Sequence, residues 1–124
     1  MKSIFEVGNL KSNGHYALAT VHQDTVYVSG QFSIDPITSQ KNYGTIEEET
    51  LQALKNVETI IEAAGSKKDQ ILRMTLYIPD VKLWDKVDGV YKEFFGEHKP
   101  ARTVVPTREL HFGFKIEIEA IAYI

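Results

Sequence analysis

The chain of 124 residues contains no cysteine, so it has no disulfide, no thiolate nucleophile and no cysteine-ligated metal. It has no apolar run near the roughly 18 residues of a membrane span, and its first residues lack the apolar segment of a signal peptide. Its 14 Lys and Arg do not outnumber its 17 Asp and Glu, which leaves no basic excess to neutralise nucleic-acid phosphates. We therefore expect a cytoplasmic protein with neither membrane nor nucleic-acid partners.

The composition that remains is typical of one folded domain. Hydrophobic residues make up 43% of the chain and charged residues 25%, a balance found in globular proteins rather than in disordered tails. A chain of this length buries roughly two-thirds of its unfolded surface, which is sufficient to fold without cross-links. We treat residues 1–124 as a single domain.

Apolar spacing and turn residues predict the order strand, strand, helix, strand, helix, strand, strand. Thr45 and Glu48 match a capping box at the start of the first helix, and Asp80 is the expected cap of the second. Gly65 and Gly96 are the expected helix ends. One or two weaker strands are also expected before residue 46. The predicted elements cover residues 16–21, 26–32, 45–64, 72–78, 80–96, 102–107 and 115–123.

Helical connections between strands predict a mixed sheet with both helices packed on one face, because right-handed crossovers in one direction leave their helices on one side. The last strand has one small apolar face, suited to packing under helices: Ile116, Ile118, Ala120 and Ala122. Its other face mixes acids with large apolar groups: Glu117, Glu119, Ile121 and Tyr123. Such a mixture is unusual for a solvent face and predicts partial burial against another subunit.

Standard catalytic motifs are absent: there is no P-loop, dinucleotide fingerprint, G-x-S-x-G or H-E-x-x-H, and the four histidines lack ligand spacing. Arg102, which follows Pro100-Ala101, can present a planar guanidinium to a carboxylate or phosphate, or form an ordinary surface ion pair. Glu117 can equally be a solvated or interface acid, and Tyr16 a packing aromatic. Residue patterns alone therefore indicate a small oligomeric α+β domain of open function.

Five segments taken together resemble the RidA/YjgF family of enamine/imine deaminases: Val28-Ser29-Gly30-Gln31, Glu62-Ala63-Ala64-Gly65, Tyr91 with Phe94-Phe95, Pro100-Ala101-Arg102, and residues 116–122. The resemblance extends from about Gly14 to Ala122, and the last two segments are its most specific part. It implies a chorismate-mutase-like α+β fold. It also implies a homotrimer whose sheets form a barrel, with ligand clefts between neighbouring subunits.

The resemblance further implies hydrolysis of 2-iminobutanoate and 2-iminopropanoate to 2-oxo acids and ammonia, without a cofactor. Arg102 matches the arginine of the family and would bind the substrate carboxylate through two hydrogen bonds. Glu117 matches the acid that positions or deprotonates the attacking water. Tyr16, Ser29 and Gly30 match the wall of the cleft.

Several positions depart from the family pattern as we know it. His15 and His111 replace prolines, Val104 replaces a cysteine, Asp88 replaces an asparagine, and Pro106 replaces an acid. These changes indicate a subgroup with a modified cleft, in which Asp88, Val104 and His111 are expected to contact the substrate. A carboxylate at position 88 disfavours an anionic substrate unless it is neutralised.

Two other functions stay open at this point. The same cleft can serve a non-catalytic module that binds a small carboxylate and reports its level to a partner. Some relatives have been linked to RNA cleavage or translation inhibition, which the acidic charge balance argues against here. His15 and His111 are also candidates for a pH-sensitive pair at the mouth of the cleft.

Overall fold

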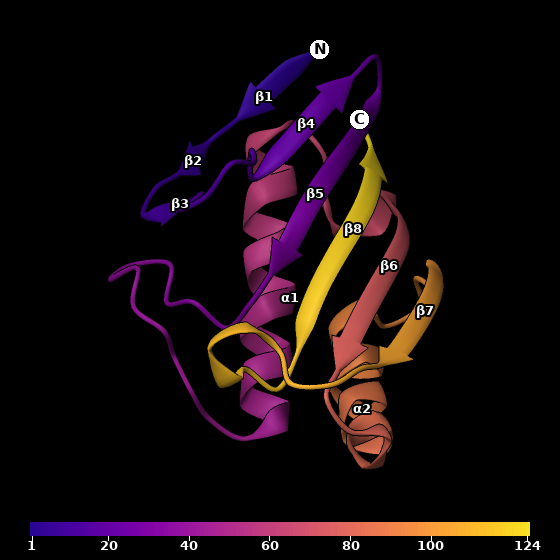
Figure 1. Ribbon diagram of the computed structural model, residues 1–124. Coiled ribbons are helices and arrows are strands. Elements are labelled where there is room, and N and C mark those ends of the chain that lie inside the picture. The colour runs from indigo at the N-terminus through magenta and orange to yellow at the C-terminus, as the bar shows by residue number, and fades with distance from the viewer.

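The computed structural model describes all residues 1–124 as a six-stranded mixed sheet with two helices on one face (Figure 1). The strand order is β1-β4-β5-β8-β6-β7, and only β6 and β7 run parallel. The strands of this sheet are β1 (Lys2–Ile4), β4 (Ala19–His22), β5 (Thr25–Gln31), β6 (Ile71–Ile78), β7 (Ala101–Pro106) and β8 (Glu117–Tyr123). A separate small hairpin joins β2 (Glu6–Val7) to β3 (Leu10–Lys11). The predicted element order is confirmed, and three short strands precede β4 where one or two were expected.

Helix α1 (Ile46–Ala63) begins at the predicted capping box. The Glu48 amide donates to Thr45 Oγ1 at 3.1 Å, and the Thr45 amide donates to Glu48 Oε1 at 2.9 Å. The chain leaves the helix at Gly65, whose φ of 94° favours glycine. Leu51 is apolar, but 38% of it is exposed. At 100° per residue it falls outside the arc that carries Ala53, Val57 and Ile61.

Helix α2 (Trp84–Phe95) packs against α1 and ends at Gly96, whose φ is 62°. The prediction that Asp80 caps this helix is only partly right. Asp80 Oδ1 accepts a hydrogen bond from the Lys82 amide at 2.9 Å and so caps a separate 3₁₀ turn, η2 (Val81–Leu83). The helix proper follows at Trp84 with no side-chain cap.

Strand β6 departs from the predicted alternation at its start. Leu72, where the predicted strand begins, is 47% exposed, and Ile71 is buried instead, together with Met74, Leu76 and Ile78. The register against β8 shifts between Ile71 and Arg73, so the strand bulges there. A bulge inserts one residue and thereby reverses the facing of the residues before it.

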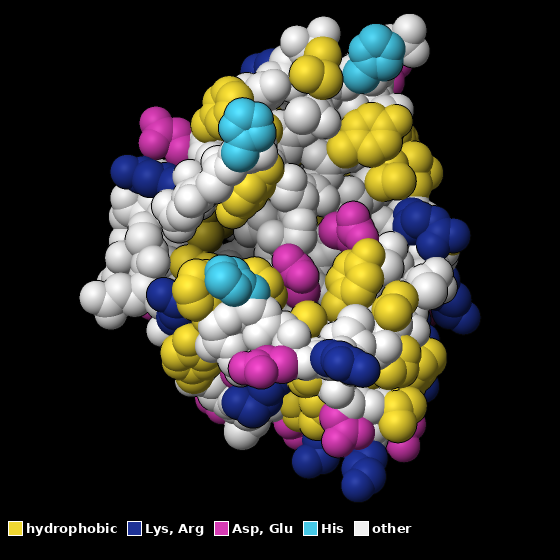
Figure 2. All heavy atoms as spheres, viewed as in Figure 1, with side chains coloured by type: hydrophobic (Ala, Val, Ile, Leu, Met, Phe, Trp, Pro, Cys, Tyr) yellow, Lys and Arg dark blue, Asp and Glu magenta, His cyan; other side chains and the backbone are white.

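The core lies between the sheet and the two helices, and it includes the predicted apolar face of β8: Ile116, Ile118, Ala120 and Ala122. The other face of the sheet carries no helix. Tyr27 and Tyr123 are exposed there, 48% and 43% respectively. Figure 2 shows acidic groups over β8 in the middle of this face, with hydrophobic groups around them.

Candidate functional site

Arg102 lies on the edge strand β7, where it is directly opposite Met74 of β6. Paired residues of neighbouring strands point to the same side of a sheet, so Arg102 shares the helix-covered side with buried Met74. Its Nη1 donates to Asp88 Oδ1 at 2.7 Å, and its Cζ lies 4.8 Å from the centre of the Tyr91 ring. Asp88 and Tyr91 are one turn apart on α2, which explains why both reach the same guanidinium. Val104, two residues further along β7, is buried.

The ion pair between Arg102 and Asp88 determines the ionisation of Asp88 and the net charge around the guanidinium. The Arg102 hydrogen bond holds the pKa of Asp88 below its ordinary value, with a further contribution from Lys92 at 3.3 Å, while partial burial opposes the shift. Asp88 is therefore a carboxylate at neutral pH and offsets much of the Arg102 charge. Burial raises the pKa of Tyr91 to about 12, so its hydroxyl stays protonated. That hydroxyl is buried and has no hydrogen-bond partner.

Glu117 begins β8 and lies over Gly30 of β5. A Cβ atom added at Gly30 would lie 2.8 Å from Glu117 Cδ and 3.1 Å from Glu117 Cγ, so a larger residue would displace this side chain from its present position. Burial is the main cause that raises the pKa of Glu117, and the negative charge of Glu119 adds to it. The nearby His111 acts in the opposite direction.

Arg102 and Glu117 point to opposite sides of the sheet. Glu117 is paired with Tyr77 and Arg102 with Met74, both in β6. Met74 and Tyr77 are three residues apart in one strand, so their side chains alternate to different faces. One chain therefore does not bring this arginine and this glutamate together.

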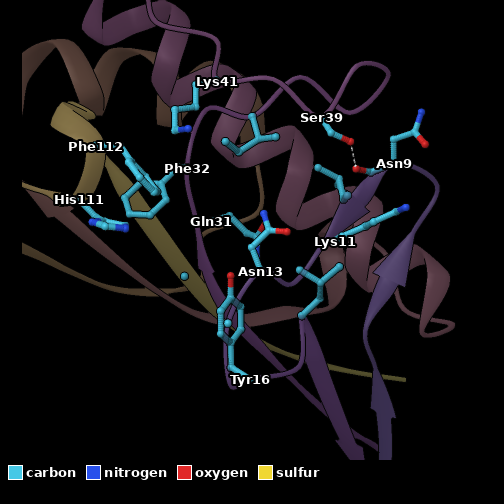
Figure 3. Close-up of a pocket in the computed structure, with 15 residues that line it drawn as sticks. Asn9, Lys11, Asn13, Tyr16, Gln31, Phe32, Ser39, Lys41, His111 and Phe112 are labelled. Atoms are coloured by element: carbon cyan, nitrogen blue, oxygen red, sulfur yellow. Dashed lines mark hydrogen bonds between the residues drawn. The ribbon is translucent and has the colours of Figure 1, made fainter.

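Three of the predicted substrate-binding residues, Tyr16, Gly30 and His111, line a pocket of about 370 Å³. In Figure 3 the rings of His111 and Phe112 stand on one side of the pocket and the hydroxyl of Tyr16 points in from another. Glu117 borders the pocket through its contact with Gly30. The structure thus groups these residues with Glu117 and leaves Arg102, Asp88 and Val104 on the other side of the sheet.

Ser29 is next to this pocket but does not line it. Its Oγ donates to the Ala17 carbonyl at 2.7 Å, and its amide donates to the Leu18 carbonyl at 2.9 Å. The hydroxyl therefore ties β5 to the segment that carries Tyr16. Its contact with the site is indirect, through the backbone that it holds.

The two histidines of the expected pH-sensitive pair are not joined by a hydrogen bond. His111 lines the pocket, and its ring centre lies 3.6 Å from that of Phe112. His15 is exposed and is not among the lining residues.

Sequence reasoning did not single out the residues that complete the pocket wall, which include Asn13, Phe32 and Lys41. Asn13 and Lys41 lie outside the named strands, where no periodic pattern marks a side chain for a site. Phe32 belongs to the predicted strand 26–32, whose pattern does not distinguish a site residue from a packing one. The clearest available signal was the loop that starts at Asp35-Pro36, because long loops on a rigid sheet often carry function.

The structure has no group of three or more His, Asp or Glu side chains placed to hold a metal ion. Neither α1 nor α2 combines the length and the apolar character that crossing a bilayer demands.

The sequence and the fold both match one class of protein. The family model described as Endoribonuclease L-PSP matches residues 7–124, and the chain belongs to this family, which is also called RidA/YjgF. The fold is the chorismate-mutase-like α+β fold of the YjgF structures.

Particular relatives cover nearly the whole chain. A RutC family protein of Pyrococcus horikoshii is 39% identical over 97% of this chain and 95% of its own. The human 2-iminobutanoate/2-iminopropanoate deaminase is 37% identical over 88% of this chain and 80% of its own. The crystal structure of Escherichia coli TdcF with bound serine has a TM-score of 0.91 and 32% identity, with 99% of each chain covered.

Proposed function

We propose that this protein hydrolyses small 2-imino acids, such as 2-iminobutanoate and 2-iminopropanoate, to 2-oxo acids and ammonia. The observation that carries the proposal is the placement of Glu117 over Gly30 at the edge of a pocket, in a chain that also keeps Arg102. Membership of the family and the 37% identity to the human deaminase support the same reaction. TdcF, a relative with bound serine, is in keeping with a ligand of this size and chemistry.

The active site would be shared between two copies of the chain in a homotrimer. One protomer would supply Glu117, Tyr16 and Gly30, and its neighbour would supply Arg102 and Asp88. Two observations support this arrangement. Arg102 and Glu117 point to opposite sides of one sheet, and the helix-free face exposes large side chains, including Tyr27 and Tyr123, that a neighbouring sheet would cover.

In this site Arg102 would bind the substrate carboxylate and thereby fix the position of the imine carbon. Glu117 would accept a proton from water while the water oxygen bonds to that carbon. Transfer of that proton to nitrogen would give the carbinolamine. Glu117 would then move the hydroxyl proton of the carbinolamine to the same nitrogen. The C–N bond would break with formation of the C=O bond, which releases ammonia and leaves the 2-oxo acid. A glutamate with a raised pKa is a better general base than an ordinary one, because proton transfer is most effective when the pKa approaches the working pH.

The Asp88 carboxylate makes this cleft different from one with a neutral side chain at that position. Asp88 accepts a hydrogen bond from Nη1 of the Arg102 guanidinium. The remaining N–H groups of the guanidinium are free to bind the substrate. Together with Val104 and His111, Asp88 would define a subgroup with a modified cleft. Asp88 would weaken the binding of anionic substrates and hold the guanidinium in one orientation.

The reaction needs no cofactor in this account, because Arg102 and Glu117 supply binding and proton transfer. RNA cleavage, the activity named in the family model, fits the chain less well, since acidic residues outnumber basic ones.

The direct test couples a threonine dehydratase to the purified protein and follows the formation of 2-oxobutanoate. We expect the wild-type protein to accelerate it, and the matched variant Arg102→Ala to have no more effect than buffer. Equal rates with the wild-type and variant proteins would refute the proposal. Saturable binding of 2-oxobutanoate without any acceleration would instead favour a non-catalytic binding module.

A further inference from the structure

We infer that the pocket beside Glu117 selects imino acids whose side chain ends in a second carboxylate, with Lys41 as the partner of that carboxylate. The inference rests on the proposed function, because it assumes that the reacting end of the substrate lies at Glu117. It goes beyond that function by naming the substrate class.

The pocket is too large for the smallest substrates of the proposed reaction. Its volume of about 370 Å³ is many times the roughly 10–15 Å³ that holds one water molecule. In the proposed pose, the carboxylate and the imine of the substrate lie at Arg102 and Glu117, at the edge of this space. The methyl group of 2-iminopropanoate would leave most of it to water, so a longer side chain fits better.

The basic side chains that line the pocket are Lys11, Lys41 and His111. No Asp or Glu is among the lining residues. Lys11 is paired with Glu6 at 4.0 Å, whereas Lys41 has no carboxylate within ion-pair distance. The Lys41 ammonium instead lies 4.3 Å from the centre of the Phe112 ring, at the wall of the pocket (Figure 3). An unpaired ammonium beside apolar rings is a good receptor for a carboxylate.

The backbone that presents Lys41 is already held in place. Lys41 forms an isolated β-bridge with Ile34, which closes the loop between them. Inside the loop, Asp35 Oδ1 accepts hydrogen bonds from the amides of Ile37 at 2.8 Å and Thr38 at 3.2 Å. The Asn9 side chain donates to the Ile37 carbonyl and ties the loop to the β2–β3 hairpin. Binding therefore requires little ordering of this segment.

The aromatic rings at the pocket suggest a competing class, substrates with an aromatic side chain. Two of these rings are already engaged with other groups. Phe32 stacks on Phe114 with ring centres 4.8 Å apart, and Phe112 is in contact with both His111 and Lys41. The third ring, Tyr16, presents its hydroxyl to the pocket (Figure 3). The Lys41 ammonium, which has no carboxylate partner, therefore favours an acidic side chain over an aromatic one.

Calorimetry with stable 2-oxo acids tests the inference without turnover. The ligands are matched in chain length: 2-oxoglutarate against 2-oxopentanoate, and 2-oxoadipate against 2-oxohexanoate, with phenylpyruvate as the aromatic probe. At one ionic strength we expect at least one dicarboxylate to bind about tenfold or more tightly than its matched monocarboxylate, as a charged hydrogen bond provides. Lys41→Gln should bring this ratio close to one. Lys55→Gln removes the same charge from the outward side of α1, outside this pocket, and should keep the ratio.

Three results would overturn the inference: equal affinities within each matched pair, a ratio that Lys41→Gln leaves unchanged, or phenylpyruvate as the tightest ligand. Absence of binding by every 2-oxo acid would overturn it as well. A protein that fails the dehydratase assay but shows the expected selectivity would refute the proposed hydrolysis and support the pocket assignment. The two failures are therefore distinguishable.

Discussion

The Arg102 guanidinium donates a hydrogen bond to Asp88 Oδ1 at 2.7 Å, so the group proposed to bind the substrate carboxylate already holds a carboxylate of its own chain. A substrate anion must approach this pair against the negative charge of Asp88. We predict that Asp88→Asn lowers the dissociation constant for 2-oxobutanoate about fivefold, the effect of removing roughly 1 kcal/mol of like-charge repulsion. Calorimetry measures the change. An unchanged or higher dissociation constant would mean that Asp88 serves to orient Arg102 rather than to compete for it.

The contact between Glu117 and Gly30 predicts a strong effect of a single added methyl group. Gly30→Ala would place its Cβ against the Glu117 carboxylate and displace that side chain from the edge of the pocket. The displaced atoms are the far end of a flexible side chain, so we expect a change in stability of no more than about 1 kcal/mol, together with loss of imine hydrolysis. Urea denaturation and the dehydratase-coupled assay measure the two effects.

Gly89 provides the matched control for this substitution. It lies within α2, and a Cβ added there would meet no atom within 4 Å. Gly89→Ala should therefore raise the free energy of unfolding by about 0.5–1 kcal/mol, because alanine is the better helix former. A Gly30→Ala protein as stable and active as Gly89→Ala would contradict the placement of Glu117.

The raised pKa of Glu117 predicts how activity depends on pH. Burial and the charge of Glu119 disfavour the ionised form, so the rate should fall on acidification at a pH above the ordinary glutamate value of 4.5. Glu119→Gln removes the like charge and should move this acid limb to lower pH. A limb that does not move in Glu119→Gln would show that another group titrates.

The same pKa shift predicts a change in stability with a definite sign. Because the pKa is higher in the folded state, stability is lost as the pH rises from the unfolded value through the folded one. Glu117→Gln abolishes this loss, so it should raise the free energy of unfolding at pH 7 and lose that advantage below about pH 4. Urea denaturation at both values measures the difference. An equal effect at the two values would contradict the shift.

Two substitutions of the buried Tyr91 distinguish the role of its ring from the role of its hydroxyl. Its hydroxyl has no partner, while its ring lies under Arg102. Tyr91→Phe should leave stability the same or slightly higher, because it removes an unsatisfied buried polar group. Tyr91→Leu should raise KM for the imine, because it removes the ring against which Arg102 is held. A large loss of kcat in Tyr91→Phe would show instead that the hydroxyl contacts the substrate.

Local signals predicted most of the fold. The capping box at Thr45, the glycine ends of both helices and the alternation of residues 116–122 depend on near neighbours, and the structure has all of them. One error falls where a distant contact decides. Leu72 is exposed because β6 bulges against β8, a pairing that the segment itself does not encode.

The candidate site was less accessible to sequence reasoning. Arg102 and Glu117 were singled out through a family resemblance, and their residue patterns alone allowed ordinary ion pairs. Their opposite facing depends on the registers of β7 and β8 against β6, which follow from the assembled sheet. Lys41 lies in a loop that only the bridge to Ile34 places beside the pocket. Sequence spacing contains neither of these relationships.

The central claim is that Arg102 of one protomer and Glu117 of another form one active site, and subunit mixing tests it directly. Arg102→Ala and Glu117→Gln proteins should each be inactive in the dehydratase assay. When the two are unfolded and refolded together in equal amounts, chance assembly gives about a quarter of the trimer sites both intact residues, one from each partner. We predict recovery of about a quarter of wild-type activity. A correctly refolded mixture that stays inactive would contradict the shared site.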